Sequence, residues 1–119
     1  MFTYSHREPE EERRSSERPI SNLDMYFVYI MKNKTHSTLY VGFTSNLTKR
    51  VFEHREGLSR GFAKKYKLTR LVYYEAGECY DGVLSREKEL KKWNRLKKEK
   101  NITTFNPHWS DLYDRIDMD

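Results

Sequence analysis

Residues 25–50 read MYFVYIMKNKTHSTLYVGFTSNLTKR, and this stretch decides the fold. Two runs rich in aromatic and β-branched residues, 26–31 and 38–42, have the composition of β-strands. The polar segment between them is short, which favours an antiparallel hairpin. We expect a register that places Tyr29 directly opposite Tyr40 and leaves residues 33–36 as the loop. Both tyrosine side chains would then lie side by side on one face of the sheet.

A basic helix is expected directly after this hairpin. In this interpretation Gly42 ends the second strand, and a helix runs from Leu47 to about Glu56, where Gly57 stops it. Arg50 and His54 lie one turn apart at the edge of its apolar stripe.

The remaining pattern predicts a third strand and two more helices. The run RLVYYEA at 70–76 reads as a strand, and a long helix is expected from Gly82 to Lys100. Pro107 stops one element, and a short amphipathic helix follows it. The fold class is therefore α+β: a small three-stranded, mostly antiparallel sheet flanked by helices, in the order β-β-α-β-α-α. Residues 1–24 read as a disordered charged leader before a folded domain at 25–119.

The charge is concentrated in the middle of the chain. The whole chain has 23 basic and 18 acidic side chains. Residues 1–24 hold four arginines and six acids, and residues 108–119 hold one arginine and four aspartates. Residues 25–107 therefore carry 18 basic and 8 acidic groups, a net charge of +10. Such a density attracts polyanions, which makes nucleic acid the favoured partner over a merely soluble surface.

Cysteine usage and hydropathy limit the cellular setting. Cys79 is the only cysteine, so neither an intramolecular disulfide nor a zinc site built from several thiolates is expected. The longest apolar run, YFVYIM, is too short to span a bilayer. These features predict a cytoplasmic protein without a membrane partner.

Glu87 is the acidic residue that needs an explanation. On the predicted long helix it lies on the same face as Val83, whereas Glu89 points away from that face. A carboxylate on the core-facing side of a helix needs a cation or a metal ion, or its pKa rises. Two interpretations stay open: an ion pair with Arg50 or Lys91, and a ligand for a metal.

An ordered set of short motifs resembles the GIY-YIG nuclease family, especially its small stand-alone bacterial members. The matching segments are FVY at 27–29, YVG at 40–42, TSNLTKRVFEH at 44–54, RLVYYE at 70–75, REKELKKW at 86–93 and NPHWSDLY at 106–113. The resemblance covers roughly residues 25–115. The first motif departs from the family pattern, since Phe27-Val28-Tyr29 replaces Gly-Ile-Tyr, but its tyrosine is retained.

The resemblance implies a role for each matching residue. Tyr29 would help to deprotonate the attacking water, and Tyr40 would help to position the scissile phosphate. Arg50 would bind the phosphate and stabilise its developing charge, while His54 would join proton transfer or phosphate contact. Glu87 would be the single protein ligand of Mg²⁺, with Mn²⁺ as an alternative ion.

Two further sets of residues are expected at the site. Asn106 would contact or orient it, and the resemblance calls for another His, Lys or Tyr after the first helix. Lys64, Lys65 and Tyr66 compete for that second role, and the sequence does not choose among them. The side chains expected to contact nucleic acid are Lys49, Lys64, Lys65, Lys91, Lys92 and Arg95.

The sequence therefore predicts a metal-dependent endonuclease that hydrolyses phosphodiester bonds in DNA, with RNA left open as a substrate. Residues 25–119 offer no room for a separate sequence-reading domain, so the shape of the DNA, a protein partner or a homodimer mate would supply selectivity. The main alternative is a non-catalytic nucleic-acid-binding module on the same scaffold. A protein-interaction domain with incidental charge is a third interpretation.

Overall fold

The computed structural model describes residues 2–5, 25–58 and 61–117 of the chain. Its centre is an antiparallel sheet of three strands, β2 (Tyr26–Lys32), β3 (Thr38–Thr44) and β4 (Arg70–Gly77), with β2 in the middle. Helices follow β3 and β4 in the predicted order. The α+β class and the three-stranded antiparallel sheet are therefore confirmed.

A fourth strand, β1 (Phe2–Ser5), extends the sheet beyond β3. It runs parallel to β3, with Tyr4 opposite Tyr40 and Ser5 opposite Val41. This strand differs from the disordered leader predicted for residues 1–24. An edge strand presents unpaired backbone groups, and a short segment of the same chain can pair with them. The rest of that leader, residues 1 and 6–24, lies outside the described residues.

The hairpin pairs two residues away from the predicted register. Tyr29 lies opposite Gly42, so the prediction that it faces Tyr40 is wrong. The loop is longer than predicted because the Asn33 side chain helps to close it: its Oδ1 accepts the backbone N–H of Thr38 at 3.3 Å. A shift of two residues leaves every side chain on its original face. The two tyrosines therefore still share a face, with ring centroids 6.2 Å apart.

Gly42 lies inside β3 and does not end it, because the strand continues to Thr44. A Cβ atom at Gly42 would lie 2.4 Å from Cζ of Tyr29 and 2.5 Å from its hydroxyl oxygen. A glycine within a strand often marks such a close approach of another group. Here it allows the Tyr29 ring to lie across β3.

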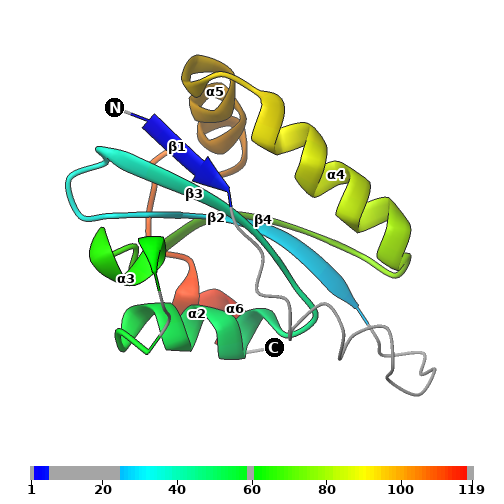
Figure 1. Cartoon of the computed structure of the whole chain (residues 1–119), viewed down its shortest axis with the longest axis horizontal. Coiled ribbons are helices and arrows are strands. Elements are labelled where there is room, and N and C mark those ends of the chain that lie inside the picture. Colours follow the sequence, from blue (N-terminus) through cyan, green and yellow to red (C-terminus); the bar gives the residue numbers. More distant parts are fainter. Residues whose placement is uncertain (1, 6–24, 59–60, 118–119) are drawn as a thin grey trace.

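Helices cover both faces of the sheet (Figure 1). On one face lie α2 (Leu47–Arg55) and α6 (Tyr113–Asp117), which pack against each other. On the other lie α4 (Tyr80–Lys92) and α5 (Arg95–Phe105), and the short α3 (Phe62–Lys65) precedes β4. None of the helices in the described ranges is long and apolar enough to cross a membrane.

The long helix predicted from Gly82 to Lys100 is wrong, since two helices occupy this segment. Trp93 and Asn94 have extended ψ angles of 144° and 173°, which interrupt the helical backbone. Asn94 then caps α5, because its Oδ1 accepts the backbone N–H of Lys97 at 2.8 Å. Asparagine is among the preferred N-cap residues, so a new helix begins at this position, although apolar periodicity alone predicts that the first helix continues.

Each face of the sheet has its own hydrophobic core. The core under α4 and α5 contains Val28, Ile30, Leu39, Val41, Phe43, Val72, Tyr73, Val83, Leu90 and Ile102. The core under α2 and α6 contains Tyr29, Met31, Tyr40, Leu47, Val51, Leu68, Leu71, Leu112 and Ile116. Successive strand residues point to opposite faces, which explains how neighbouring positions of β2 enter different cores.

Candidate active site

Three aromatic side chains meet between β2, β3 and α2. The Tyr29 hydroxyl oxygen lies 3.2 Å from Nε2 of His54. The His54 ring centroid lies 5.9 Å from that of Tyr29 and 5.5 Å from that of Tyr40. Each of the three residues is 3% exposed or less. The structure thus brings together the tyrosines of both motifs and the histidine of the basic helix.

The His54 imidazole is neutral near pH 7. Burial lowers its pKa from 6.5 to about 3, and the positive charge of Arg50 adds to the shift. A neutral imidazole has one N–H and one acceptor nitrogen, so its hydrogen bond with Tyr29 depends on the tautomer. Because so weak a base takes up a proton poorly, the role that fits His54 is to orient the phenol.

Arg50 extends from α2 beside this group. Its side chain is 11% exposed, and its Nη1 lies 3.2 Å from Oε1 of Glu53. Asn46 caps α2 by accepting the backbone N–H of Lys49 at 3.1 Å. The helix thereby holds Arg50 and His54 one turn apart, as the spacing predicts. A mostly buried guanidinium offers directed N–H groups that suit a phosphate.

Glu87 approaches the sheet from the opposite face. It lies on α4 with Val83 and Leu90, on the side of the helix that enters the other core, and it has no exposed surface. Its Oε2 lies 3.0 Å from Nζ of Lys91, one of the two ion-pair partners that the sequence left open. Helix α4 packs against β2 and β3, the strands that carry the two tyrosines.

The Glu87 carboxylate matches a metal site with a single protein ligand in its chemistry, but its oxygens are buried, so the side chains that cover them would have to move for an ion to bind. The described residues contain no group of three or more His, Cys, Asp or Glu side chains that could hold an ion together. Mg²⁺ commonly keeps several waters and binds through one or two carboxylates plus substrate phosphates, so one glutamate suffices. Because Lys91 contacts the same carboxylate, a metal ion would have to displace the ammonium or share Glu87 with it.

Asn106 lies at the C-terminal end of α5, where its side chain holds a turn. Its Nδ2 donates to the backbone carbonyls of Val72 at 3.1 Å and Ser110 at 2.8 Å. Its Oδ1 accepts the N–H of Ser110 at 3.2 Å. These bonds tie the segment after α5 to β4. A catalytic role for Asn106 stays a prediction. Its hydrogen bonds favour an indirect role, in which it holds the segment after α5 in place.

Of the three candidates after the first helix, Tyr66 is the one that packs against the core under α2 and α6. It is partly buried against the core that contains Tyr29 and Tyr40. Lys64 and Lys65 are exposed, and Nζ of Lys65 lies 5.4 Å from the Tyr66 ring centroid. The geometry therefore favours Tyr66 as the additional site residue and leaves the two lysines free to contact nucleic acid.

The other predicted nucleic-acid contacts are spread over three helices. Lys49 on α2 and Lys92 on α4 are exposed. Arg95, at the start of α5, pairs through Nε with Oε2 of Glu99 at 2.7 Å. Lys91 is partly buried beside the glutamate of the site. The exposed lysines lie where a polyanion could reach them.

Residues 25–101 match the family model of the GIY-YIG catalytic domain. The chain belongs to this family. GIY-YIG domains are nuclease domains, and the match confirms the resemblance drawn from the motifs. No solved structure shows significant similarity to the chain.

The similar curated proteins include several UPF0213 proteins. One from Staphylococcus saprophyticus is 35% identical over 81 residues, which are 68% of this chain and 98% of that protein. One from Haloquadratum walsbyi is 34% identical over 76 residues, 64% of this chain and 84% of its own. One from Staphylococcus aureus is 37% identical over 76 residues, 64% of this chain and 92% of its own.

Proposed function

We propose that this GIY-YIG domain is a metal-dependent endonuclease that hydrolyses phosphodiester bonds in DNA. The observation that carries the proposal is the meeting of Tyr29, Tyr40 and His54 beside Arg50, all within the segment that matches the GIY-YIG catalytic domain. Binding alone requires neither a buried phenol–imidazole pair nor a carboxylate on the inner face of α4. Selectivity comes from the shape of the DNA or from a protein partner.

We assign Glu87 and the tyrosines to one site beside Gly42 of β3. The Tyr29 ring lies over Gly42 of this strand, and α4 packs on the strand's other face. Over the described residues β1 pairs with β3 from Thr38 to Val41. The scissile phosphate binds beside Arg50, on the face of the sheet that α2 covers (Figure 1).

Each side chain has a distinct task in hydrolysis. His54 orients the Tyr29 hydroxyl, which positions the attacking water. Arg50 donates hydrogen bonds to the phosphate oxygens and stabilises the charge that develops on them. Tyr40 packs beside both aromatic rings and fixes their places. A divalent ion on Glu87 would supply Lewis-acid polarisation of the phosphate and a bound water of lowered pKa.

A cleavage assay tests the proposal. Labelled single-stranded, nicked, flapped and duplex DNAs, and a single-stranded RNA, are incubated with Mg²⁺ or Mn²⁺. Glu87→Gln removes the charge and keeps the shape, and Glu89→Gln is its control, because Glu89 is 55% exposed and pairs with Arg86. We expect cleavage by the wild type and by Glu89→Gln, and none by Glu87→Gln. Salt-sensitive binding without cleavage of any substrate would refute the proposal in favour of a binding module.

A further inference from the structure

Positive charge gathers at the end of the sheet where the hairpin turns. We call Lys32, His36, Arg70, Arg95 and Lys98 the hairpin-end cluster. Lys32 ends β2 and Arg70 begins β4, and the two residues are direct partners in the antiparallel pair. Like charges in directly opposite positions repel each other. The fold itself therefore gains nothing from this pair of cations.

Helix α5 brings two more cations to the same place. Nη2 of Arg95 donates to the backbone carbonyl of His36 and so holds the helix against the hairpin loop. Lys98, three residues later, is 2% exposed, and no carboxylate of the described residues lies within ion-pair distance of it. Burying an unpaired ammonium is costly, and burial together with Arg95 lowers its pKa from 10.5 to about 8.

The cations of the cluster lie within electrostatic reach of one another. Burial and the charge of Arg70 lower the pKa of Lys32, which is 3% exposed, while Asp111 opposes that shift. The pKa of His36 is lowered by burial and by Lys32, Arg95 and Arg70, so this imidazole is neutral near pH 7 and reports the positive field around it. One connected field of positive charge therefore spans the end of β2, the start of β4 and the first turns of α5.

Two carboxylates that border this field are already engaged. Glu99 pairs with Arg95 at 2.7 Å. Asp111 pairs with Arg55, and its Oδ1 accepts the backbone N–H of Leu71 at 3.3 Å. The remaining cations of the cluster are thus incompletely compensated within the described part of the chain. An anion from outside would relieve their repulsion.

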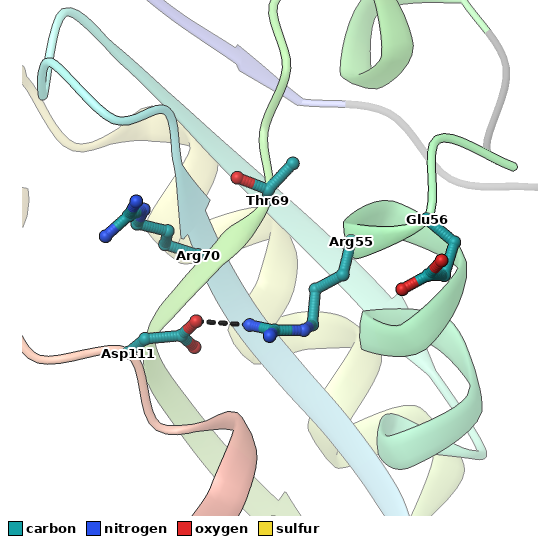
Figure 2. A pocket seen from close by; sticks show the side chains of 5 residues that line it. All are labelled: Arg55, Glu56, Thr69, Arg70 and Asp111. Atoms are coloured by element: carbon teal, nitrogen blue, oxygen red, sulfur yellow. Dashed lines mark hydrogen bonds and ion pairs between the residues drawn. The ribbon is translucent and has the colours of Figure 1, made fainter.

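A pocket of about 430 Å³ adjoins the cluster at Arg70 (Figure 2). It is lined by Arg55, Glu56, Thr69, Arg70 and Asp111. Figure 2 shows Arg55 and Asp111 pointing toward each other, while the Arg70 guanidinium points away from Glu56. Because Arg55 ends α2, the pocket connects the cluster with the helix that carries the catalytic candidates.

We propose that the hairpin-end cluster binds backbone phosphates of the nucleic acid beside the bond that the active site cleaves. This inference rests on the proposed nuclease function. The accessible cations, Arg70 and Arg95, come from β4 and α5 and can contact successive phosphates of one strand. Lys32 and Lys98 are buried and add to the positive field beneath them. Such contacts fix the position of a strand without reading its sequence.

Binding by matched double variants tests the inference. Arg70→Gln with Lys98→Met removes two cluster charges and keeps the buried lysine stem apolar. Lys88→Gln with Lys100→Met removes two charges from exposed helical positions and is the control. Fluorescence anisotropy with the best-cleaved labelled oligonucleotide is measured in EDTA across a KCl series. Urea unfolding confirms that both variants are folded, and each single variant is measured as well.

We expect the cluster variant to lose about tenfold or more in affinity at low salt. Loss of the direct phosphate contact of Arg70 should also reduce the slope of log K against log[salt] by about 0.7–0.9. The control should change much less in both quantities. Equal behaviour of the two double variants would overturn the inference, while wild-type cleavage in the same preparation would leave the nuclease function standing. A wild type that neither binds nor cleaves any nucleic acid would overturn both.

Discussion

A single methyl group at Gly42 should disable the site without removing any functional group. The Cβ of Gly42→Ala would lie 2.4 Å from Cζ of Tyr29. Carbon atoms in contact normally stay about 3.5–4.0 Å apart, so the ring or the strand must move by roughly 1 Å. Since Tyr29 is 1% exposed, the ring has little open space to enter. Overpacking of this kind costs about 1–3 kcal/mol of unfolding free energy.

The loss of activity should be larger than the loss of stability suggests. A displacement of about 1 Å can cost roughly 10²-fold in rate, so single-turnover cleavage by Gly42→Ala should fall by about that factor. Gly82→Ala is the matched control, because its Cβ would meet Cys79 at an ordinary 3.5 Å. Gly82 lies in α4, where alanine favours the helix by about 1 kcal/mol. That variant should cleave normally and be at least as stable as the wild type.

A double-mutant cycle tests whether the clash with the Tyr29 ring causes the destabilisation by Gly42→Ala. Unfolding free energies are measured in urea for Gly42→Ala, Tyr29→Ala and the combination. Removing the ring leaves room for the new methyl group, so Gly42→Ala should cost much less in the Tyr29→Ala background. Wild-type cleavage and stability in Gly42→Ala would refute the close approach of Tyr29 to β3 and the placement of the phenol that depends on it.

Three further predictions concern charge. Arg50→Ala should lower single-turnover cleavage by about 10²-fold or more, as loss of one charge-stabilising donor commonly does; an unchanged rate would remove Arg50 from the site. For His54 the unfolded state binds more protons between pH 3 and 6.5, so acid should destabilise the wild type by up to about 5 kcal/mol more than His54→Gln. Equal acid sensitivity in urea unfolding would contradict the pKa of about 3. For Lys98 the unfolded state binds more protons between pH 8 and 10.5, so Lys98→Met should gain on the order of 1 kcal/mol at pH 7, and this gain should shrink as the pH rises to 10.5; a less stable variant at pH 7 would contradict it.

The sequence predicted which face each strand residue occupies but not which residues pair. Side chains alternate between the two faces along a strand, so a register shift of two residues still leaves Tyr29 and Tyr40 on the same face. The register itself depends on how the loop closes, and the side-chain bond from Asn33 to Thr38 is a tertiary detail that hydropathy does not contain. The role of Gly42 follows from the true register, so it became visible only with the structure.

The sequence predicted that these segments are helical, but it predicted only some of the helix boundaries. The spacing within α2 gave the relation between Arg50 and His54, because both lie on one helix. The break at Asn94 was missed, since a capping asparagine and a mid-helix asparagine look alike in a helical pattern. The facing of Lys32 and Arg70 depends on strand pairing across more than thirty residues, which local sequence patterns do not encode.

Glu87 and the Tyr29–His54 pair are assigned to one metal-dependent site although they approach the sheet from opposite faces. Paramagnetic broadening by Mn²⁺ tests this assignment most directly, with NMR of the histidine and tyrosine side chains in the wild type and in Glu87→Gln. We expect substoichiometric Mn²⁺ to broaden the His54 and Tyr29 signals in the wild type and to leave them sharp in Glu87→Gln. Sharp signals in both proteins, or equal broadening in both, would contradict a shared site built on Glu87.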